Sequence, residues 1–175
     1  MILSFKTKIN GKPTFFVEKI HSGLLQNGVT NFEGISFENK EFDLQKLVGS
    51  EPKLHTIRRD KEDLWEKGTI IDFVIDNDSE QFQFAPQLPV ISTQDIFITR
   101  RGYALEITIA KVGSYMGDDD FYLLHLEKEL LAKNDGFDTY EDFVLYFLDK
   151  IEANGRQTGN FWYSGKIIHW TDLMY

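Results

Sequence analysis

Cysteine is absent from the 175 residues of this sequence. This absence excludes disulfide bonds, thiolate catalysis and zinc sites built on cysteine. Long apolar runs are also missing, because no stretch approaches the roughly 20 residues that span a bilayer. The first six residues lack the charged head and apolar run of a signal peptide. We therefore expect a cytoplasmic protein that does not enter a membrane.

A positive net charge is lacking as well, because 28 acidic residues outnumber 19 basic ones and give a formal charge of −9. Avid, sequence-independent coating of long DNA needs a basic face that neutralises phosphates, so we do not expect it. The charge is unevenly distributed: residues 51–61 contain four basic side chains against two acidic ones. This local excess is compatible with a small anionic or polar ligand.

Signatures of metal, phosphate-loop and serine-hydrolase sites do not occur. The four histidines stand apart and form no i, i+4 pair (His21, His55, His125 and His169). Three aspartates at 118–120 can attract a hard cation, but acids at a helix N-terminus also favour the helix dipole without metal. Glycines form no phosphate loop, and Gly-x-Ser-x-Gly is missing. We expect neither a metal site nor a cofactor.

Polar and basic residues gather in one short segment. It holds Lys53, His55, Thr56, Arg58 and Arg59. The alternation over 54–58 predicts a short strand with Thr56 and Arg58 on one face and His55 on the other. These side chains can form a polar site on a rigid strand, or they can be the solvated rim of that strand.

The order of elements predicts an α+β fold. We expect strands over 2–9, 69–75, 90–99, 103–112 and 164–171, with the third and fourth joined as a hairpin. We expect helical segments over 14–26, over 60–65 with Asp60 as N-cap, after an N-cap within 118–120, and after Asp138 as N-cap with Glu141 three residues later. The buried face of the last helix would be Phe143, Phe147 and Ile151, and Asn154–Gly155 would end it. Residues 27–50 match no element clearly.

Many strands, two adjacent helices and no βαβ alternation are typical of a small barrel with flanking helices. The length favours one domain over 1–175, with 1–48 as an N-terminal extension or insertion within it. A helix pair beside such a barrel leaves a cleft, which Thr56 and the corner at 134–136 would border.

The order of these pieces resembles the ASCH domain, a branch of the PUA-like superfamily. Gly49 lies in a polar turn and is followed by Lys-x-x-Thr-Ile-Arg at 53–58, a short helix that ends at Gly68 and a strand over 69–74. Gly-Phe-Asp at 136–138, Asp-Phe at 142–143, a helix and a last strand are also similar to that family. The resemblance covers residues 49–75 and 125–172.

The resemblance implies a PUA-like barrel with a cleft for RNA, nucleotides or modified nucleosides. One branch of the family hydrolyses N4-acetylcytidine with a lysine, a threonine and a glutamate. Lys53 and Thr56 match the first two. The acidic position falls on Asp135, which is one methylene shorter than glutamate. Residues 1–48 depart from the minimal enzyme and can cover or reshape the cleft.

In such a hydrolase, Thr56 would be the nucleophile and Lys53 its base, provided that burial or a cation such as Arg58 lowers the lysine pKa. Arg58 would alternatively bind an oxyanion or a phosphate, and Asp135 would donate to the leaving amine or hold the nucleoside base. In the alternative interpretation, Thr56 is an ordinary strand residue, Lys53 is solvated and Asp135 belongs to a helix-end turn.

Five further side chains are candidates for ligand binding: Arg58, Arg59, His55, Trp65 and Trp170. A tryptophan in the cleft would stack on a base, but Trp65 and Trp170 equally suit a hydrophobic core. Recognition of RNA, a nucleotide or a modified nucleoside is therefore the leading hypothesis. The alternatives are an amidohydrolase for N4-acylated cytidine-type nucleosides and a protein-interaction module.

Overall fold

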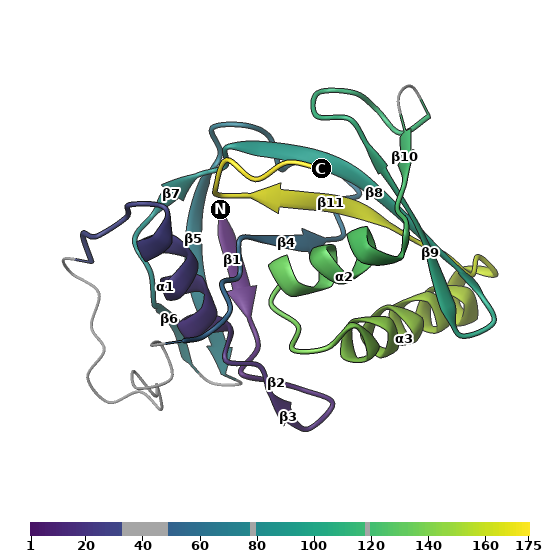
Figure 1. Cartoon of the computed structure of the whole chain (residues 1–175), viewed down its shortest axis with the longest axis horizontal. Coiled ribbons are helices and arrows are strands. Elements are labelled where there is room, and N and C mark those ends of the chain that lie inside the picture. The colour runs from purple at the N-terminus through teal and green to yellow at the C-terminus, as the bar shows by residue number, and fades with distance from the viewer. Residues whose placement is uncertain (33–48, 78–79, 118–119) are drawn as a thin grey trace.

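The computed structural model describes residues 1–32, 49–77, 80–117 and 120–175 and has an α+β architecture (Figure 1). Its described helices are α1 (Phe16–Gln26), α2 (His125–Asn134) and α3 (Tyr140–Thr158). Its described strands are β1 (Ile2–Phe5), β2 (Lys8–Ile9), β3 (Lys12–Pro13), β4 (His55–Arg58), β5 (Ile70–Asn77), β6 (Glu80–Gln83), β7 (Leu88–Pro89), β8 (Ser92–Arg101), β9 (Ala104–Ala110), β10 (Asp120–Tyr122) and β11 (Tyr163–His169). The α+β class predicted from the sequence is confirmed.

The strands form separate open sheets. The larger sheet has five strands in the order β10-β9-β8-β11-β4, all antiparallel. In the second sheet, β5 pairs with β1 in parallel and with β6 and β7 in antiparallel, while β2 and β3 form a small hairpin. Because β10 and β4 remain edge strands, the described sheets do not close into the barrel that we expected.

Two hydrophobic clusters flank β4 and β11. The first packs α1 on the β1–β5 sheet and includes Phe5, Ile20, Phe73, Ile168 and Trp170. The second lies between the five-stranded sheet and helices α2 and α3 and includes Ile57, Ile107, Phe143, Phe147 and Ile167. Figure 1 shows α1 on one side of the molecule and the α2–α3 pair on the other. The adjacent β11 residues Ile168 and Ile167 thus belong to the first and the second cluster, respectively.

The N-terminal segment is integral to the first cluster. Leu3 and Phe5 of β1 are almost fully buried, and β1 pairs with β5 from Ile2–Asp72 to Phe5–Ile75. The strand predicted over 2–9 is divided into β1 and β2, and the predicted helix over 14–26 is α1. Much of the unassigned stretch 27–50, namely residues 33–48, lies outside the described residues.

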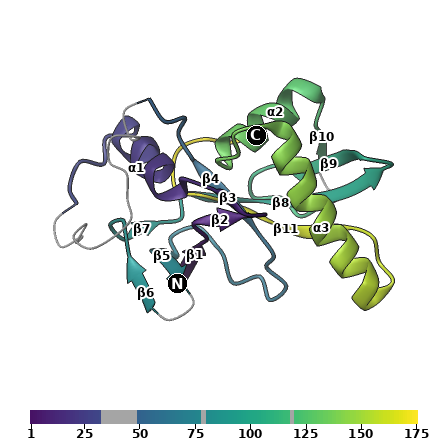
Figure 2. The same ribbon diagram turned by 90° about the horizontal axis from the view of Figure 1, so that it is seen from below.

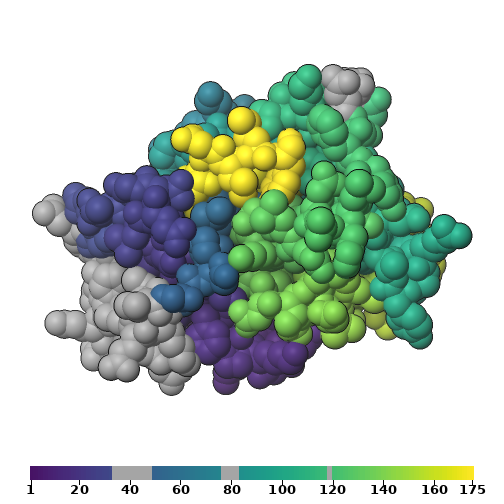
Figure 3. Space-filling view, viewed as in Figure 1, coloured from purple at the N-terminus to yellow at the C-terminus, as the bar shows by residue number. Residues whose placement is uncertain are grey.

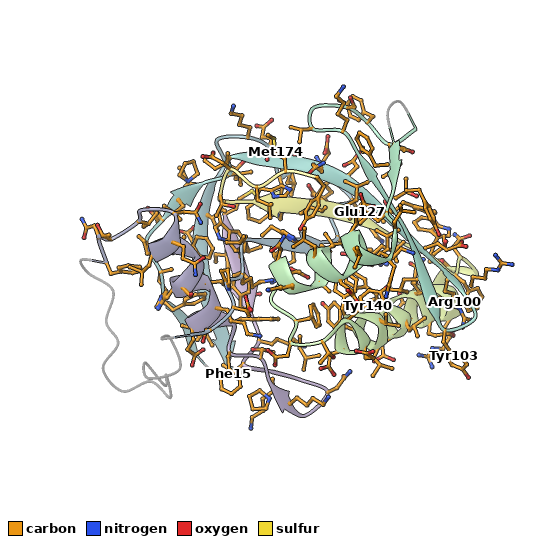
Figure 4. The ribbon with its side chains drawn as sticks, viewed as in Figure 1. Phe15, Arg100, Tyr103, Glu127, Tyr140 and Met174 are labelled. Atoms are coloured by element: carbon orange, nitrogen blue, oxygen red, sulfur yellow. The ribbon has the colours of Figure 1, made fainter. Side chains whose placement is uncertain are left out.

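The predicted hairpin is confirmed. β8 and β9 pair down to Arg101–Ala104, and Gly102 takes a left-handed conformation at the turn (φ 64°). Tyr103 projects from this turn beyond the sheet (Figure 4). None of the helices in the described ranges is long and apolar enough to cross a membrane.

The prediction of a helix over 60–65 is wrong. This stretch is an irregular loop in which the Asp60 carboxylate accepts the backbone N–H groups of Leu64 and Trp65 at 3.0 and 2.9 Å. Asp60 therefore caps a turn and not a helix. Trp65, which is 7% exposed, packs into the first cluster, so burial of its ring decides the path of the loop.

The prediction of a helix N-cap within 118–120 is also wrong for Asp120. Residues 118 and 119 lie outside the part of the chain that the structure describes. Asp120 begins β10, which pairs with the edge of β9. Helix α2 starts only at His125, and the Glu127 carboxylate accepts the N–H of Leu124 at 2.6 Å. Pairing with an open sheet edge therefore prevails over the local capping preference.

Helix α3 begins close to the expected position but runs further. Thr139 is its N-cap and accepts the N–H of Asp142, so the predicted cap at Asp138 is one residue early. Phe143, Phe147 and Ile151 are fully buried as predicted. The helix continues past Asn154–Gly155 and ends at Gly159 (φ 79°).

Candidate functional site

A pocket of about 390 Å³ lies between β4, the β1–β2 segment, the α2–α3 turn and α3. Lys53, Thr56, Arg58 and Asp135 all line it. The sequence-predicted residues thus converge, although Lys53 and Asp135 are 82 positions apart. Aromatic walls come from Phe16, Phe137 and Tyr146.

Backbone contacts fix the segment that carries Lys53. The Lys53 N–H donates to Lys19 O of α1 at 3.0 Å, and the Leu54 N–H donates to Asn134 O of α2 at 2.8 Å. Figure 3 shows this segment lying between α1 and α2 on the surface. Gly23 permits the close approach, because a Cβ there would lie 2.7 Å from Lys53 O.

Lys53 and Asp135 form a buried ion pair. Lys53 Nζ lies 2.6 Å from Asp135 Oδ1 and also donates to the backbone O of Asp135. The two side chains are only 1% and 6% exposed. The backbone of Ile57 in β4 also favours the charged form of the Asp135 carboxylate and lowers its pKa. Partnering of this kind is what allows two charges to remain inside a protein.

Burial works against both charges of this pair. It lowers the pKa of Lys53 to about 8, with Asp135 opposing the change and the nearby Arg58 and Lys19 adding to it. Burial likewise raises the pKa of Asp135, while Lys53 opposes that change. With a pKa near 8, about a tenth of Lys53 is neutral at pH 7. The lysine can therefore act as a base near physiological pH.

Thr56 presents an unengaged hydroxyl to the same pocket. The residue is 4% exposed, and its backbone is held in register opposite Ile168 of β11. No hydrogen bond to its Oγ1 occurs within the part of the chain that the structure describes. A hydroxyl without a protein partner at the wall of a pocket is available to a bound ligand.

Arg58 and Arg59 have different surroundings. Arg58 lines the pocket and donates through Nη2 to Ser4 O at 2.6 Å, while its buried Nε has no acceptor among the described residues. Arg59 is outside the pocket, where it donates to Asn154 Oδ1 at 3.3 Å and stacks over the Tyr163 ring. Only Arg58 is therefore placed to contact a ligand in the pocket.

Three other candidates lie away from the pocket lining. His55 is fully buried beneath it, hydrogen-bonded to the Tyr175 hydroxyl at 2.8 Å, with Nδ1 3.9 Å from Asp135 Oδ1. Burial lowers the His55 pKa well below its ordinary value, so the ring is neutral. Trp65 and Trp170 belong to the first hydrophobic cluster, and their rings offer no stacking surface in the pocket.

Sequence reasoning missed several pocket residues: Lys6, Lys8, Phe137, Tyr146 and Lys150. Lys6 and Lys8 lie in a segment that carries no motif, and Lys150 lies on α3 beside the face that holds the buried phenylalanines, two turns after Phe143. Only the packing of the β2–β3 hairpin beside α3 brings them together. No cluster of three or more metal-ligating side chains occurs within the described ranges.

Comparisons of the chain with known proteins found no relative. No protein-family model, curated protein or solved structure matches the chain. The functional interpretation therefore rests on the residues of the pocket.

Proposed function

We propose that the chain is an ASCH-type, PUA-like domain whose pocket recognises a nucleoside, a nucleotide or an RNA element. The observation that carries this proposal is the convergence of Lys53, Thr56, Arg58 and Asp135 in one pocket. These residues match two segments whose order resembles the ASCH domain. Their convergence also favours a pocket function over a protein-interaction module, which would be preferred if they faced separate surfaces.

The dimensions and walls of the pocket suit such a ligand. Its volume of about 390 Å³ falls in the range typical of small-molecule sites. Phe137 and Tyr146 supply aromatic surface on which a base can stack. The Thr56 hydroxyl and the Asp135 carboxylate supply an adaptable donor–acceptor pair for the edge of a base or a ribose.

Calorimetric titration with nucleosides, nucleoside monophosphates and short RNA tests this proposal. We expect Thr56→Val, which keeps the side-chain shape but removes the hydroxyl, to weaken binding about tenfold, as loss of one buried hydrogen bond does. Thr99→Val in β8, outside the pocket lining, is the matched control. Absence of binding by every ligand in the panel, with a folded wild-type protein, would refute the proposal.

A second candidate, hydrolysis of an N4-acylated cytidine-type nucleoside, is favoured by the Lys53 pKa of about 8 and by an unengaged threonine hydroxyl in the same pocket. Neutral Lys53 would take the proton of Thr56 Oγ1 as that oxygen bonds to the acyl carbon. The C–N bond then breaks, and the amine leaves with the proton from Lys53. Water finally hydrolyses the acyl-threonine ester, which releases the carboxylic acid and restores Thr56.

The rate should follow the protonation of Lys53. Because only the neutral amine is a base, kcat/KM for N4-acetylcytidine is expected to rise with pH and to level off above about 8. Chromatography of the released cytidine measures this profile. Thr56→Ala should abolish turnover, whereas His55→Gln, next to the pair but outside the pocket, should retain it. Turnover that persists in Thr56→Ala would contradict the mechanism.

A further inference from the structure

Four cationic side chains line the pocket in addition to the Lys53–Asp135 pair: Lys6, Lys8, Arg58 and Lys150. Asp149 is the one other carboxylate in the lining, so these groups leave a formal charge of +3 there. None of the four cations forms an ion pair within the described part of the chain. This local excess occurs in a protein whose net charge is −9.

The cations come from three separate parts of the chain that the fold holds together. Lys6 follows β1 and Lys8 lies in β2, Arg58 ends β4, and Lys150 lies in α3. Figure 2 shows the β2–β3 hairpin beside α3, and an ion pair between Lys12 Nζ and Asp142 Oδ1 at 2.7 Å joins them. Four like charges are thus brought to one pocket, where Asp149 offsets only part of them.

The neighbouring cations also act on Lys150. Its pKa is lowered, first by partial burial and then by the charges of Lys6, Arg58 and Arg59, while Asp149 opposes the change. Crowded cations destabilise a fold unless an anion neutralises them. A bound anion at this place would relieve the repulsion.

We propose that Lys6, Lys8, Arg58 and Lys150 form a phosphate subsite, so that the ligand of the pocket is a nucleoside phosphate or a nucleotide unit and not a neutral nucleoside. This inference rests on the proposed function for the base-binding part of the pocket. The N-terminal segment, through Lys6 and Lys8, then supplies specificity for the phosphorylated ligand.

The arrangement of the donors fits a phosphate group. Cations from three separate parts of the chain line one pocket and can contact several oxygens of one anion, which suits tetrahedral phosphate more than a planar carboxylate. Arg58 adds a guanidinium whose Nε–H has no acceptor among the described residues. Guanidinium and ammonium groups together are the usual ligands of phosphate oxygens.

Inorganic pyrophosphate probes this subsite alone. We expect calorimetry to detect its binding to the wild-type protein and an affinity at least about tenfold lower in Lys6→Gln/Lys8→Gln, from the loss of two charge-assisted contacts. Lys61→Gln/Lys67→Gln removes the same total charge outside the pocket lining and should change the affinity less than about twofold. Equal weakening in both double variants, or citrate binding as tightly as pyrophosphate, would overturn the phosphate assignment.

Nucleosides distinguish failure of the subsite from failure of the proposed function. We expect a nucleoside 5′-monophosphate to bind more tightly than the matching nucleoside, and the difference to vanish in Lys6→Gln/Lys8→Gln. Equal affinity of both for the wild type would overturn the subsite while leaving nucleoside recognition intact. Pyrophosphate binding without any nucleoside discrimination would instead refute the base-binding function. Tighter binding of a five-nucleotide RNA than of the monophosphate would assign the subsite to a backbone phosphate, and the reverse order to a free nucleotide.

Discussion

At the scale of single residues, the buried pair of Lys53 and Asp135 is the least ordinary feature of the molecule. Two ionisable groups that are almost inaccessible to water cost stability through desolvation, and only their mutual contact and hydrogen bonds offset this cost. A well-packed pair of apolar residues would fill the same space at no such cost. A buried pair that lines a pocket and has shifted pKa values is therefore typical of a functional site.

Removal of one partner should be costly. We expect Lys53→Met to lower the free energy of unfolding by about 3–5 kcal/mol at pH 7, because Asp135 would remain buried without its counter-ion. Lys53→Met/Asp135→Asn should recover much of this loss, since no uncompensated charge then stays buried. Urea unfolding of the two variants measures both values.

The exposed pair of Lys12 and Asp142 is the control. Its Nζ–Oδ1 distance of 2.7 Å nearly equals that of the buried pair, but the Lys12 side chain is 71% exposed. Because water screens this contact, Lys12→Met should cost only a small fraction of the effect of Lys53→Met. Comparable losses at both sites would mean that burial does not determine the energetics of the pair.

The residues of the site were predictable to different extents. Lys53, Thr56 and Arg58 lie in one short motif, and Asp135 is identified from the order of elements in the family that the chain resembles. The convergence of these four residues could therefore be predicted. Their catalytic role remains a prediction. Lys6, Lys8 and Lys150 could not be found, because no local pattern relates the β1–β2 segment to α3. His55 was expected on the strand face opposite Thr56, and its position beneath the pocket agrees with that alternation.

At the scale of elements, the turn between α2 and α3 determines the shape of the pocket. Asp135 ends α2, and Gly136 follows it in the left-handed conformation (φ 87°). Lys19 of α1 donates to Gly136 O at 2.7 Å and thereby ties the turn to the opposite side of the molecule. A Cβ at Gly136 would lie 2.9 Å from Lys53 Cδ and 3.1 Å from a ring carbon of Phe16.

Gly136→Ala should therefore be more harmful than its backbone conformation alone explains. The matched control is Gly159→Ala at the end of α3, which shares a positive φ (79°) but would place its Cβ in open space. We expect Gly159→Ala to cost about 1 kcal/mol and Gly136→Ala about 2–4 kcal/mol, because Lys53 must also shift. Thermal unfolding measures the difference, and equal losses would show that Lys53 and Phe16 accommodate the added methyl group.

The elements themselves were predictable where local pattern and packing agree. The β8–β9 hairpin and the buried face of α3 have strong periodicity and follow it in the structure. The failures at Asp60 and Asp120 share a cause, because an aspartate before apolar residues has the same sequence signature in a helix cap and in a turn. Burial of Trp65 decides the first case and pairing with β9 decides the second, and neither is encoded locally. The prediction of a closed barrel failed for a similar reason, because closure depends on which strands pair at the edges of the sheet.

At the scale of the whole molecule, two buried imidazoles lie where the five-stranded sheet meets the first hydrophobic cluster. His55 of β4 and His169 of β11 pack against each other with ring centroids 5.4 Å apart, and both also contact Tyr175. Both nitrogens of His169 lack a hydrogen-bond partner among the described residues. Burial lowers the His169 pKa to about 4, so the fold requires this ring to be neutral.

This requirement makes the stability of the whole fold sensitive to acid. In the unfolded chain His169 takes up a proton near pH 6.5, whereas in the folded protein it does so only near pH 4. The unfolded state therefore binds more protons between these values, and the free energy of unfolding falls as the pH is lowered through this window, by about 3 kcal/mol from this residue. His169→Leu should remove that part of the decrease, as measured by urea unfolding at pH 7 and pH 4.5. His125→Leu is the control for loss of an imidazole, because the His125 side chain is 75% exposed. If His169→Leu shows the same pH dependence as the wild type, the ring is protonated equally in both states and its burial carries no penalty for charge.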